Sequence, residues 1–181
     1  MYSAKSEYTM SDTPAAPADS QSVRAAHEAP NVFLVVVDNS PEMKVALRWA
    51  CLRARRTGGR VGLLRVIDKA DFQHWAAVGN LMREEARQEA ERLLMEYAGL
   101  AMQIHGGAPI LYIREGDIKN SVVDLIDEEP QIRTLVLAAS ASGKGPGPIV
   151  SHLMKKLIGG LRIPVTVVPG GLSDAQIDAL T

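Results

Sequence analysis

The sequence is poor in several residue types, and each scarcity excludes a class of protein. Its single cysteine, Cys51, can form neither an intramolecular disulfide nor a zinc site built from several cysteines. Two Phe and two Trp residues leave few rings for stacking on bases, and 20 basic against 21 acidic side chains give a net charge of −1. Because nucleic-acid binders usually carry a clear basic excess, we expect no nucleic-acid partner.

Long apolar runs are also missing from the chain. No segment reaches the roughly 18 uncharged apolar residues of a membrane span. Residues 1–30 lack the continuous apolar stretch that a signal peptide requires. We therefore expect a cytoplasmic protein with no membrane partner. Hydrophobic residues still make up 46% of the chain, which is enough for an aliphatic core.

Three segments of the chain differ in composition. Residues 1–30 are mostly small or polar and follow neither a strand period nor a helix period, so we expect a disordered N-terminal tail. Residues 31–170 combine apolar runs with helical periods and are expected to form one α/β domain. Residues 171–181 are expected to form a C-terminal tail or short helix, in which Ser173 and Gln176 fit a capping box.

Within the α/β domain, five apolar runs alternate with four segments of helical period. The first run lacks polar alternation, which is typical of a strand buried on both faces of a parallel sheet. The expected strands are residues 32–37, 61–67, 110–113, 134–138 and 164–168. This alternation predicts a doubly wound α/β fold, with a five-stranded parallel sheet and helices on both of its faces.

Cap residues mark the ends of the expected helices. Ser40 is a suitable N-cap for the first helix, Pro41 is a suitable first helical residue, and Gly58 ends that helix. Asp117 is the expected N-cap of the third helix. Cys51 falls on the apolar side of the first helix and is therefore predicted to be a core residue.

Ligands of a doubly wound sheet bind beyond the carboxyl ends of its strands, so the candidate places are residues 38–40, 66–68, 115–116 and 138–150. Asp38 follows the first strand, where its carboxylate could accept hydrogen bonds from a ligand or could form a turn. Residues 138–148 follow the fourth strand, and their small side chains could admit a phosphate close to the backbone, with Lys144 adding charge. A flexible surface loop is the equal alternative for this segment.

Catalytic motifs are not evident. The stretch from Ala138 to Gly145 has the outline of a P-loop, but Gly145 stands where Ser or Thr would hold magnesium. There is no Gly-x-Ser-x-Gly elbow, and no two histidines have metal-ligand spacing, so we expect no structural metal. His152 could donate to a phosphate or act as a base, although a partly exposed helix position is the favoured interpretation.

Three motifs, taken in order, resemble those of the universal stress protein family. Residues 35–40, Val-Val-Val-Asp-Asn-Ser, are similar to the family's strand-Asp-x-Ser opening. Residues 64–68, Leu-Arg-Val-Ile-Asp, end the second strand, and residues 163–168, Ile-Pro-Val-Thr-Val-Val, resemble the family's closing Cys-Pro-Val-hydrophobic segment. The resemblance covers residues 31–170. It implies the sheet order 3-2-1-4-5, a site between strands one and four, and a homodimer with antiparallel pairing of the fifth strands.

The resemblance also implies individual site residues. Asp38 matches the family's aspartate, and Val66 matches its valine at the adenine edge. Nucleotide-binding members carry Gly-x-x-Gly, nine residues, and then Gly-Ser or Gly-Thr after the fourth strand. Counted back from Pro164, these four positions hold Ala138, Ala141, Ser151 and His152. None of the four matches the family motif.

The adenine half of the implied site is therefore retained, and the phosphate half is altered. The expected nucleotide-binding residues are Asp38, Val66, Leu137, Ala138, Ala141, Gly143, Lys144, Gly145, Ser151 and His152. Alanine in place of glycine adds a methyl group where the ribose or phosphates approach the backbone. Residues 143–145, Gly-Lys-Gly, could supply a different phosphate cradle or could fill the site.

Three functions remain open at this point. The leading one is a homodimeric stress-response module that binds ATP or another adenine nucleotide, or signals, through a modified phosphate loop. The second is a slow ATP hydrolase or phosphotransfer protein, in which Lys144 and His152 would stabilise charge, although no water-positioning group is evident. The third is a dimerising interaction protein whose pocket is empty. The lack of catalytic groups favours the first.

Overall fold

A computed structural model describes residues 30–68, 79–142, 146–147, 150–151 and 160–181. Residues 1–29, which make up nearly all of the expected disordered tail, lie outside these ranges, as do residues 69–78, 143–145, 148–149 and 152–159.

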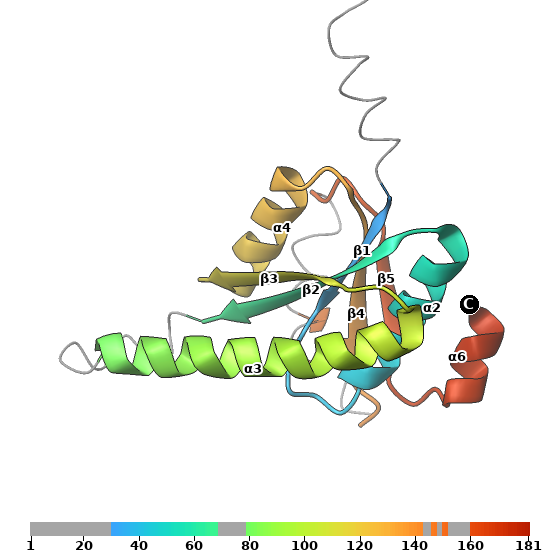
Figure 1. Cartoon of the computed structure of the whole chain (residues 1–181), viewed down its shortest axis with the longest axis horizontal. Helices are drawn as coiled ribbons and strands as arrows, with labels where there is room; N and C mark the ends of the chain where they lie inside the picture. Colours follow the sequence, from blue (N-terminus) through green and yellow to red (C-terminus); the bar gives the residue numbers. More distant parts are fainter. Residues whose placement is uncertain (1–29, 69–78, 143–145, 148–149, 152–159) are drawn as a thin grey trace, which may run out of the picture.

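Five parallel strands form a single sheet in the order β3-β2-β1-β4-β5 (Figure 1). The strands are β1 (Val32–Val36), β2 (Arg60–Ile67), β3 (Ile110–Glu115), β4 (Ile132–Ala139) and β5 (Val165–Pro169). The order and the parallel pairing confirm the predicted doubly wound sheet. The direction of winding reverses between β1 and β4, so the carboxyl ends of these two strands form the switch point of the fold.

Helices cover both faces of the sheet (Figure 1). Helices α2 (Met43–Thr57) and α3 (Gly79–His105) pack on one face, and α4 (Ile118–Glu128) packs on the other. The short α6 (Asp174–Leu180) lies against α2. Because successive side chains of a strand point to opposite faces, Leu34 and Val35 of β1 enter different core clusters, and both are 0% exposed.

The apolar face of α2 contains Cys51, as predicted. Its buried residues are Met43, Ala46, Leu47, Ala50, Cys51 and Ala54. Gly58 ends the helix in the left-handed conformation, with φ 68°, which glycine adopts without the steric cost that a Cβ atom adds.

The start of α2 differs from the prediction, because Ser40 is not its N-cap and Pro41 is not its first residue. Glu42 is the N-cap, and the helix begins at Met43. The Ser40 hydroxyl donates to Asp38 Oδ1 at 2.6 Å, and the Ser40 amide donates to the same oxygen at 2.9 Å. These bonds form a turn that engages the hydroxyl, so the chain passes through residues 40–42 before it becomes helical.

Two other predicted caps are confirmed. Asp117 Oδ1 accepts hydrogen bonds from the amides of Lys119 and Asn120, each at 3.1 Å, and thereby caps α4. Ser173 and Gln176 form the expected capping box at the start of α6.

The carboxyl end of α4 is held by a residue distant in sequence. The guanidinium group of Arg162 donates to the carbonyl oxygen of Glu129 at 2.9 Å and to that of Ile132 at 3.2 Å. It also donates to the carbonyl oxygen of Ile126. The last carbonyls of a helix lack partners within the helix, and Arg162 supplies a donor to that of Ile126 while it joins the end of α4 to the start of β4.

Replacing Arg162 with Met is expected to lower the free energy of unfolding by about 1–2 kcal/mol, because several carbonyls lose a charged donor. The matched control is Arg87→Met, which breaks an exposed pair with Glu91 at 3.1 Å and is expected to cost less than about 0.5 kcal/mol. Urea denaturation measures both variants. Equal losses would contradict the capping role of Arg162.

Burial controls the reactivity of Cys51. Desolvation raises the pKa of its thiol to about 12, and the charge of Arg55 offsets this only in part. Because the thiolate is the reactive form, the native protein at pH 8 is expected to react with a water-soluble disulfide reagent at least about a hundredfold more slowly than the unfolded protein. The single cysteine makes the signal unambiguous. Similar rates before and after unfolding would show that Cys51 is accessible.

Candidate functional site

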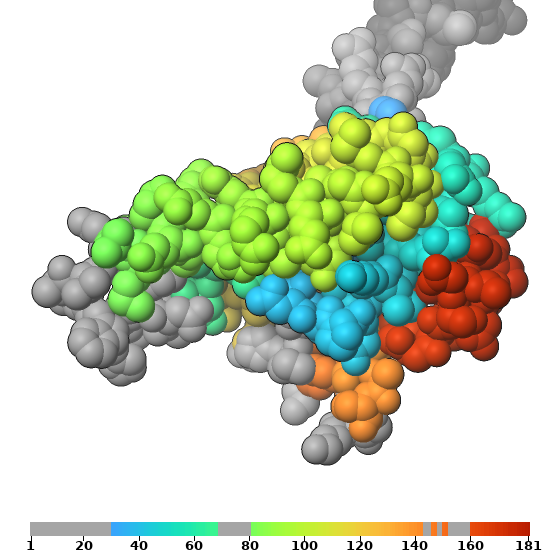
Figure 2. All heavy atoms as spheres, turned by 60° about the horizontal axis from the view of Figure 1, so that its bottom comes forward, coloured from blue at the N-terminus to red at the C-terminus, as the bar shows by residue number. Residues whose placement is uncertain are grey.

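The segments that follow β1 and β4 meet at the switch point. Figure 2 brings this edge of the sheet forward, with the blue residues after β1 next to the orange residues near 140 and the red C-terminal segment. The contact is made by Glu42, whose carboxylate bonds to Ser140 and Ala141. Of the predicted site residues, Asp38 and Ala141 therefore lie on adjoining segments.

Asp38 is half-buried directly beyond β1. Both of its hydrogen bonds from Ser40 end on Oδ1, so the turn that was one of its two predicted roles is present. Within the described part of the chain, these bonds leave Oδ2 with its acceptor sites. The carboxylate can thus hold the turn with one oxygen and accept from a ligand with the other.

The remaining predicted residues occupy different environments. Val66 is half-buried near the end of β2, where it packs against the core cluster on the α4 face. Leu137 is 1% exposed, so a ligand could reach only its backbone, whereas Ala138 is half-buried. Ser151 is half-buried, and its amide donates to the carbonyl oxygen of Gly147 at 2.9 Å. Gly143, Lys144, Gly145 and His152 lie outside the described residues.

The segment after β4 turns back on itself. The Ser140 amide donates to the carbonyl oxygen of Pro146 at 3.0 Å, and the Ser140 hydroxyl lies 3.0 Å from the Ser142 hydroxyl. Gly147 has a φ of 92°, a conformation that favours glycine, and a Cβ atom there would lie 3.6 Å from Ser140 Cβ. Backbone amides and hydroxyls are therefore gathered at this end of β4.

Glu42 is the site residue that the sequence reasoning missed. Its Oε1 atom accepts from the Ala141 amide at 3.0 Å and from the Ser140 hydroxyl at 3.2 Å. The Ala141 bond is the main reason that the pKa of Glu42 lies below its ordinary value, because it favours the ionised form. The only sequence signal was an acidic residue at a helix start, which the helix dipole explains without any role at a site.

The Cβ and Cγ atoms of Glu42 pack closely against Gly170. A Cβ atom at this position would lie 2.1 Å from Glu42 Cγ and 2.6 Å from the carbonyl oxygen of Ala139. The Gly170 amide also donates to that carbonyl at 2.8 Å. Segments that follow β1, β4 and β5 therefore converge on one carboxylate, and only glycine fits at their closest approach.

Arg65 brings a half-buried positive charge to the same end of the sheet. Its Nη1 atom donates to the carbonyl oxygen of Val37 at 3.2 Å, next to Asp38. Its Nε atom is buried and has no hydrogen-bond partner among the described residues. In the sequence, Arg65 is part of the second-strand motif, and nothing about its charge there indicates a role at a site.

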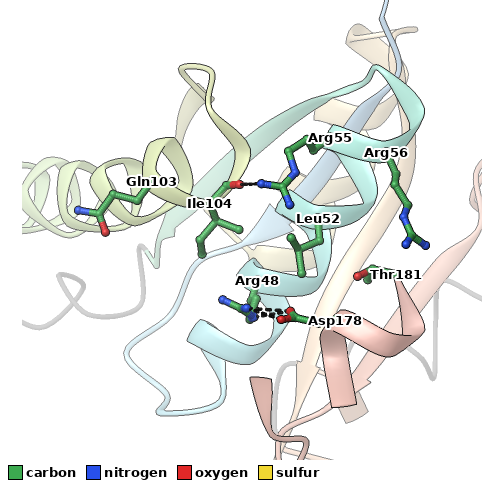
Figure 3. Close-up of a pocket in the computed structure, with 8 residues that line it drawn as sticks. All are labelled: Arg48, Leu52, Arg55, Arg56, Gln103, Ile104, Asp178 and Thr181. Carbon is green, nitrogen blue, oxygen red and sulfur yellow. Dashed lines mark hydrogen bonds and ion pairs between the residues drawn. The ribbon is translucent and has the colours of Figure 1, made fainter. Parts of the chain in front are cut away.

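Two pockets lie away from the switch point. One, of about 400 Å³, lies between α2, α3 and α6 and contains three arginines (Figure 3). Two of these are already engaged, because Arg48 forms a two-pronged bond with Asp178 and Arg55 donates to the carbonyl oxygen of Ile104 at 2.9 Å. The second, of about 450 Å³, lies beside β4 and β5 and contains Trp49. None of the predicted site residues lines either pocket.

The chemistry at the switch point is that of hydrogen bonding. It offers carboxylate acceptors together with hydroxyl and amide donors, which suit a polar small molecule. In the ranges that the structure describes, no three His, Cys, Asp or Glu residues are grouped so that they could hold a metal ion. No helix in those ranges combines the length and the apolar character needed to cross a bilayer.

Solved structures of known proteins share this fold. Universal stress protein UspA from Lactobacillus plantarum matches with a TM-score of 0.64 and 20% identity, over 77% of this chain and 98% of that one. The universal stress protein from Archaeoglobus fulgidus in complex with dAMP gives 0.56 and 17%, over 77% and 97%. A universal stress protein in complex with cAMP gives 0.55 and 15%, over 79% and 99%.

The sequence itself identifies the family. The comparison with curated proteins gave no match. The model of the universal stress protein family, however, matches residues 31–169, which include every strand of the sheet. The solved structures agree with this assignment in fold. The chain therefore belongs to the universal stress protein family.

Proposed function

We propose that this protein is a stress-response module that binds an adenine nucleotide at the switch point between β1 and β4. The observation that carries the proposal is the convergence of Asp38 and the segment after β4 at this edge of the sheet. Structural neighbours described as complexes with dAMP and cAMP support the choice of an adenine ligand. A net charge of −1 also favours a small molecule over a nucleic acid.

Each predicted residue has a role in this proposal. Asp38 Oδ2 accepts from the amine of the base or from a ribose hydroxyl, and Val66 packs against the base. The ribose and phosphate lie along the segment after β4, where small side chains let them approach the backbone. The residues assigned to this segment are Leu137, Ala138, Ala141, Gly143, Lys144, Gly145, Ser151 and His152.

The proposed protein is a homodimer that pairs through β5. In the described part of the chain, β5 pairs only with β4, and its residues Val165, Thr166 and Val167 are half-buried. An apolar edge strand with unpaired backbone groups is a template for a further strand. Antiparallel pairing of two β5 strands would cover both edges.

Replacing Asp38 with Asn tests the nucleotide site directly. Asparagine keeps an oxygen for the two Ser40 bonds but places an NH₂ group where Oδ2 accepts. We expect the unfolding temperature to stay near that of the wild type and the affinity for adenosine and AMP to fall about tenfold or more. Isothermal titration calorimetry measures the affinity, and Asn39→Ala in the same turn is the control.

The outcomes of this experiment distinguish an error in the assignment of Asp38 from an error in the proposed function. Unchanged affinity in Asp38→Asn would remove Asp38 from the site. A wild-type protein that carries no adenine nucleotide by mass spectrometry after heat release, and that takes up none of those added, would contradict the proposed function.

The dimer is tested at Val167. The Gly170 amide bonds to Ala139 on β4, and alternation along the strand turns the amide of Val167 away from β4. Val167→Pro therefore removes an outward donor and leaves the bonds to β4 in place. We expect light scattering to give a dimeric mass for the wild type and a monomeric mass for the variant. A monomeric wild type at micromolar concentration would contradict the dimer.

A further inference from the structure

Two donors at the start of the segment after β4 are already bound to an acid of this same chain. The Ala141 amide and the Ser140 hydroxyl both donate to Glu42 Oε1, at 3.0 and 3.2 Å. Ala141 is exposed and Ser140 is half-buried, so the residues that carry both donors lie at the surface of the switch point. A phosphate group in this segment would seek the same two donors.

We propose that Glu42 is a specificity-determining residue that sets the charge of the ligand. Its carboxylate takes the donors that a phosphate would use, so the site prefers a nucleoside or a nucleoside monophosphate to a polyphosphate. This inference rests on the proposed adenine-nucleotide site, and it names the class of ligand that the site takes.

Competition for donors is the first reason. The Ala141 amide carries one hydrogen, and it cannot bond fully to a carboxylate and to a phosphate oxygen at the same time. The Ser140 hydroxyl likewise has one hydrogen, for which Glu42 and the Ser142 hydroxyl, 3.0 Å away, already compete. A phosphate must therefore displace Glu42 or bind without these donors.

Repulsion between like charges is the second reason. The Ala141 bond keeps the pKa of Glu42 below its ordinary value, so the carboxylate is ionised at neutral pH. A phosphate that reached the same donors would lie within a few ångströms of this negative charge. The penalty grows with ligand charge, so it is largest for a triphosphate and absent for a nucleoside.

The carboxylate is also held in place from two sides. Its stem rests on Gly170, where a Cβ atom would lie 2.1 Å from Glu42 Cγ. Its backbone is the N-cap of α2, so the helix dipole favours the negative charge there. The position of Glu42 at the switch point is therefore fixed by its surroundings, and moving its carboxylate aside costs free energy.

The test compares Glu42→Gln with the wild type. Glutamine has the shape of glutamate and keeps an oxygen for the Ala141 amide, but it has no charge. Glu85→Gln on the exposed side of α3 is the matched control. We expect calorimetry at 0.15 M salt to show ATP binding strengthened about tenfold or more in Glu42→Gln, AMP less, and adenosine within about twofold. The control is expected to change none of the three.

Equal changes for ATP and adenosine, or no change for ATP, would overturn the inference while leaving the proposed function in place. Binding of none of the three ligands to either protein would overturn the proposed function.

A second measurement does not depend on the adenine. Inorganic phosphate, followed by NMR, is expected to shift the amide signal of Ala141 in Glu42→Ala, where no side-chain oxygen is left to accept from this amide, and to leave it unshifted in the wild type. A matching shift in the two proteins would show that Glu42 does not compete for these donors, whatever the nucleotide results.

Discussion

Burial of β1 on both faces is the constraint on which the rest of the structure depends. Each of its side chains is at most 8% exposed, so the strand can exist only between two layers of helices. This central position places β1 beside both β2 and β4 and creates the switch point at its carboxyl end. Polar residues can appear only where the strand leaves the core, which is where Asp38 stands.

Asp38 and Glu42, the two acidic residues at the switch point, both form hydrogen bonds within the chain. Asp38 holds the turn that delays α2, and Glu42 joins the start of α2 to the segment after β4. The two differ in what they leave for a ligand. The bonds from Ser40 engage one oxygen of Asp38, whereas Glu42 takes donors away from the segment that would receive a phosphate. In the proposed nucleotide site, this edge would therefore favour the neutral part of the ligand and oppose its charged part.

Much of the fold was predictable because its signals are local. Apolar runs without alternation marked the strands, and the caps at Asp117 and Ser173 follow from residues within one turn. Ser40 failed as a cap because an equally local competitor, Asp38, takes its hydroxyl. The contacts of Glu42 with Ala141 and Gly170 were beyond prediction, since they join residues about a hundred or more positions apart. Neither a hydrophobic period nor the spacing of a motif in the sequence indicates such a contact.

Stability alone explains the Glu42 contact poorly. Ala141 is exposed, so water could satisfy its amide, and exposed charged contacts contribute little to folding. Yet the chain keeps glycine at position 170, where any side chain would strike Glu42 and the backbone of Ala139. Glycine at 170 is needed for the close approach to the Ala139 carbonyl whether or not Glu42 is present, so the specific role of the Glu42 contact lies in its effect on the proposed site. In our proposal, that effect is a fixed negative charge beside the donors of the segment after β4, which would select a ligand by charge as well as by shape.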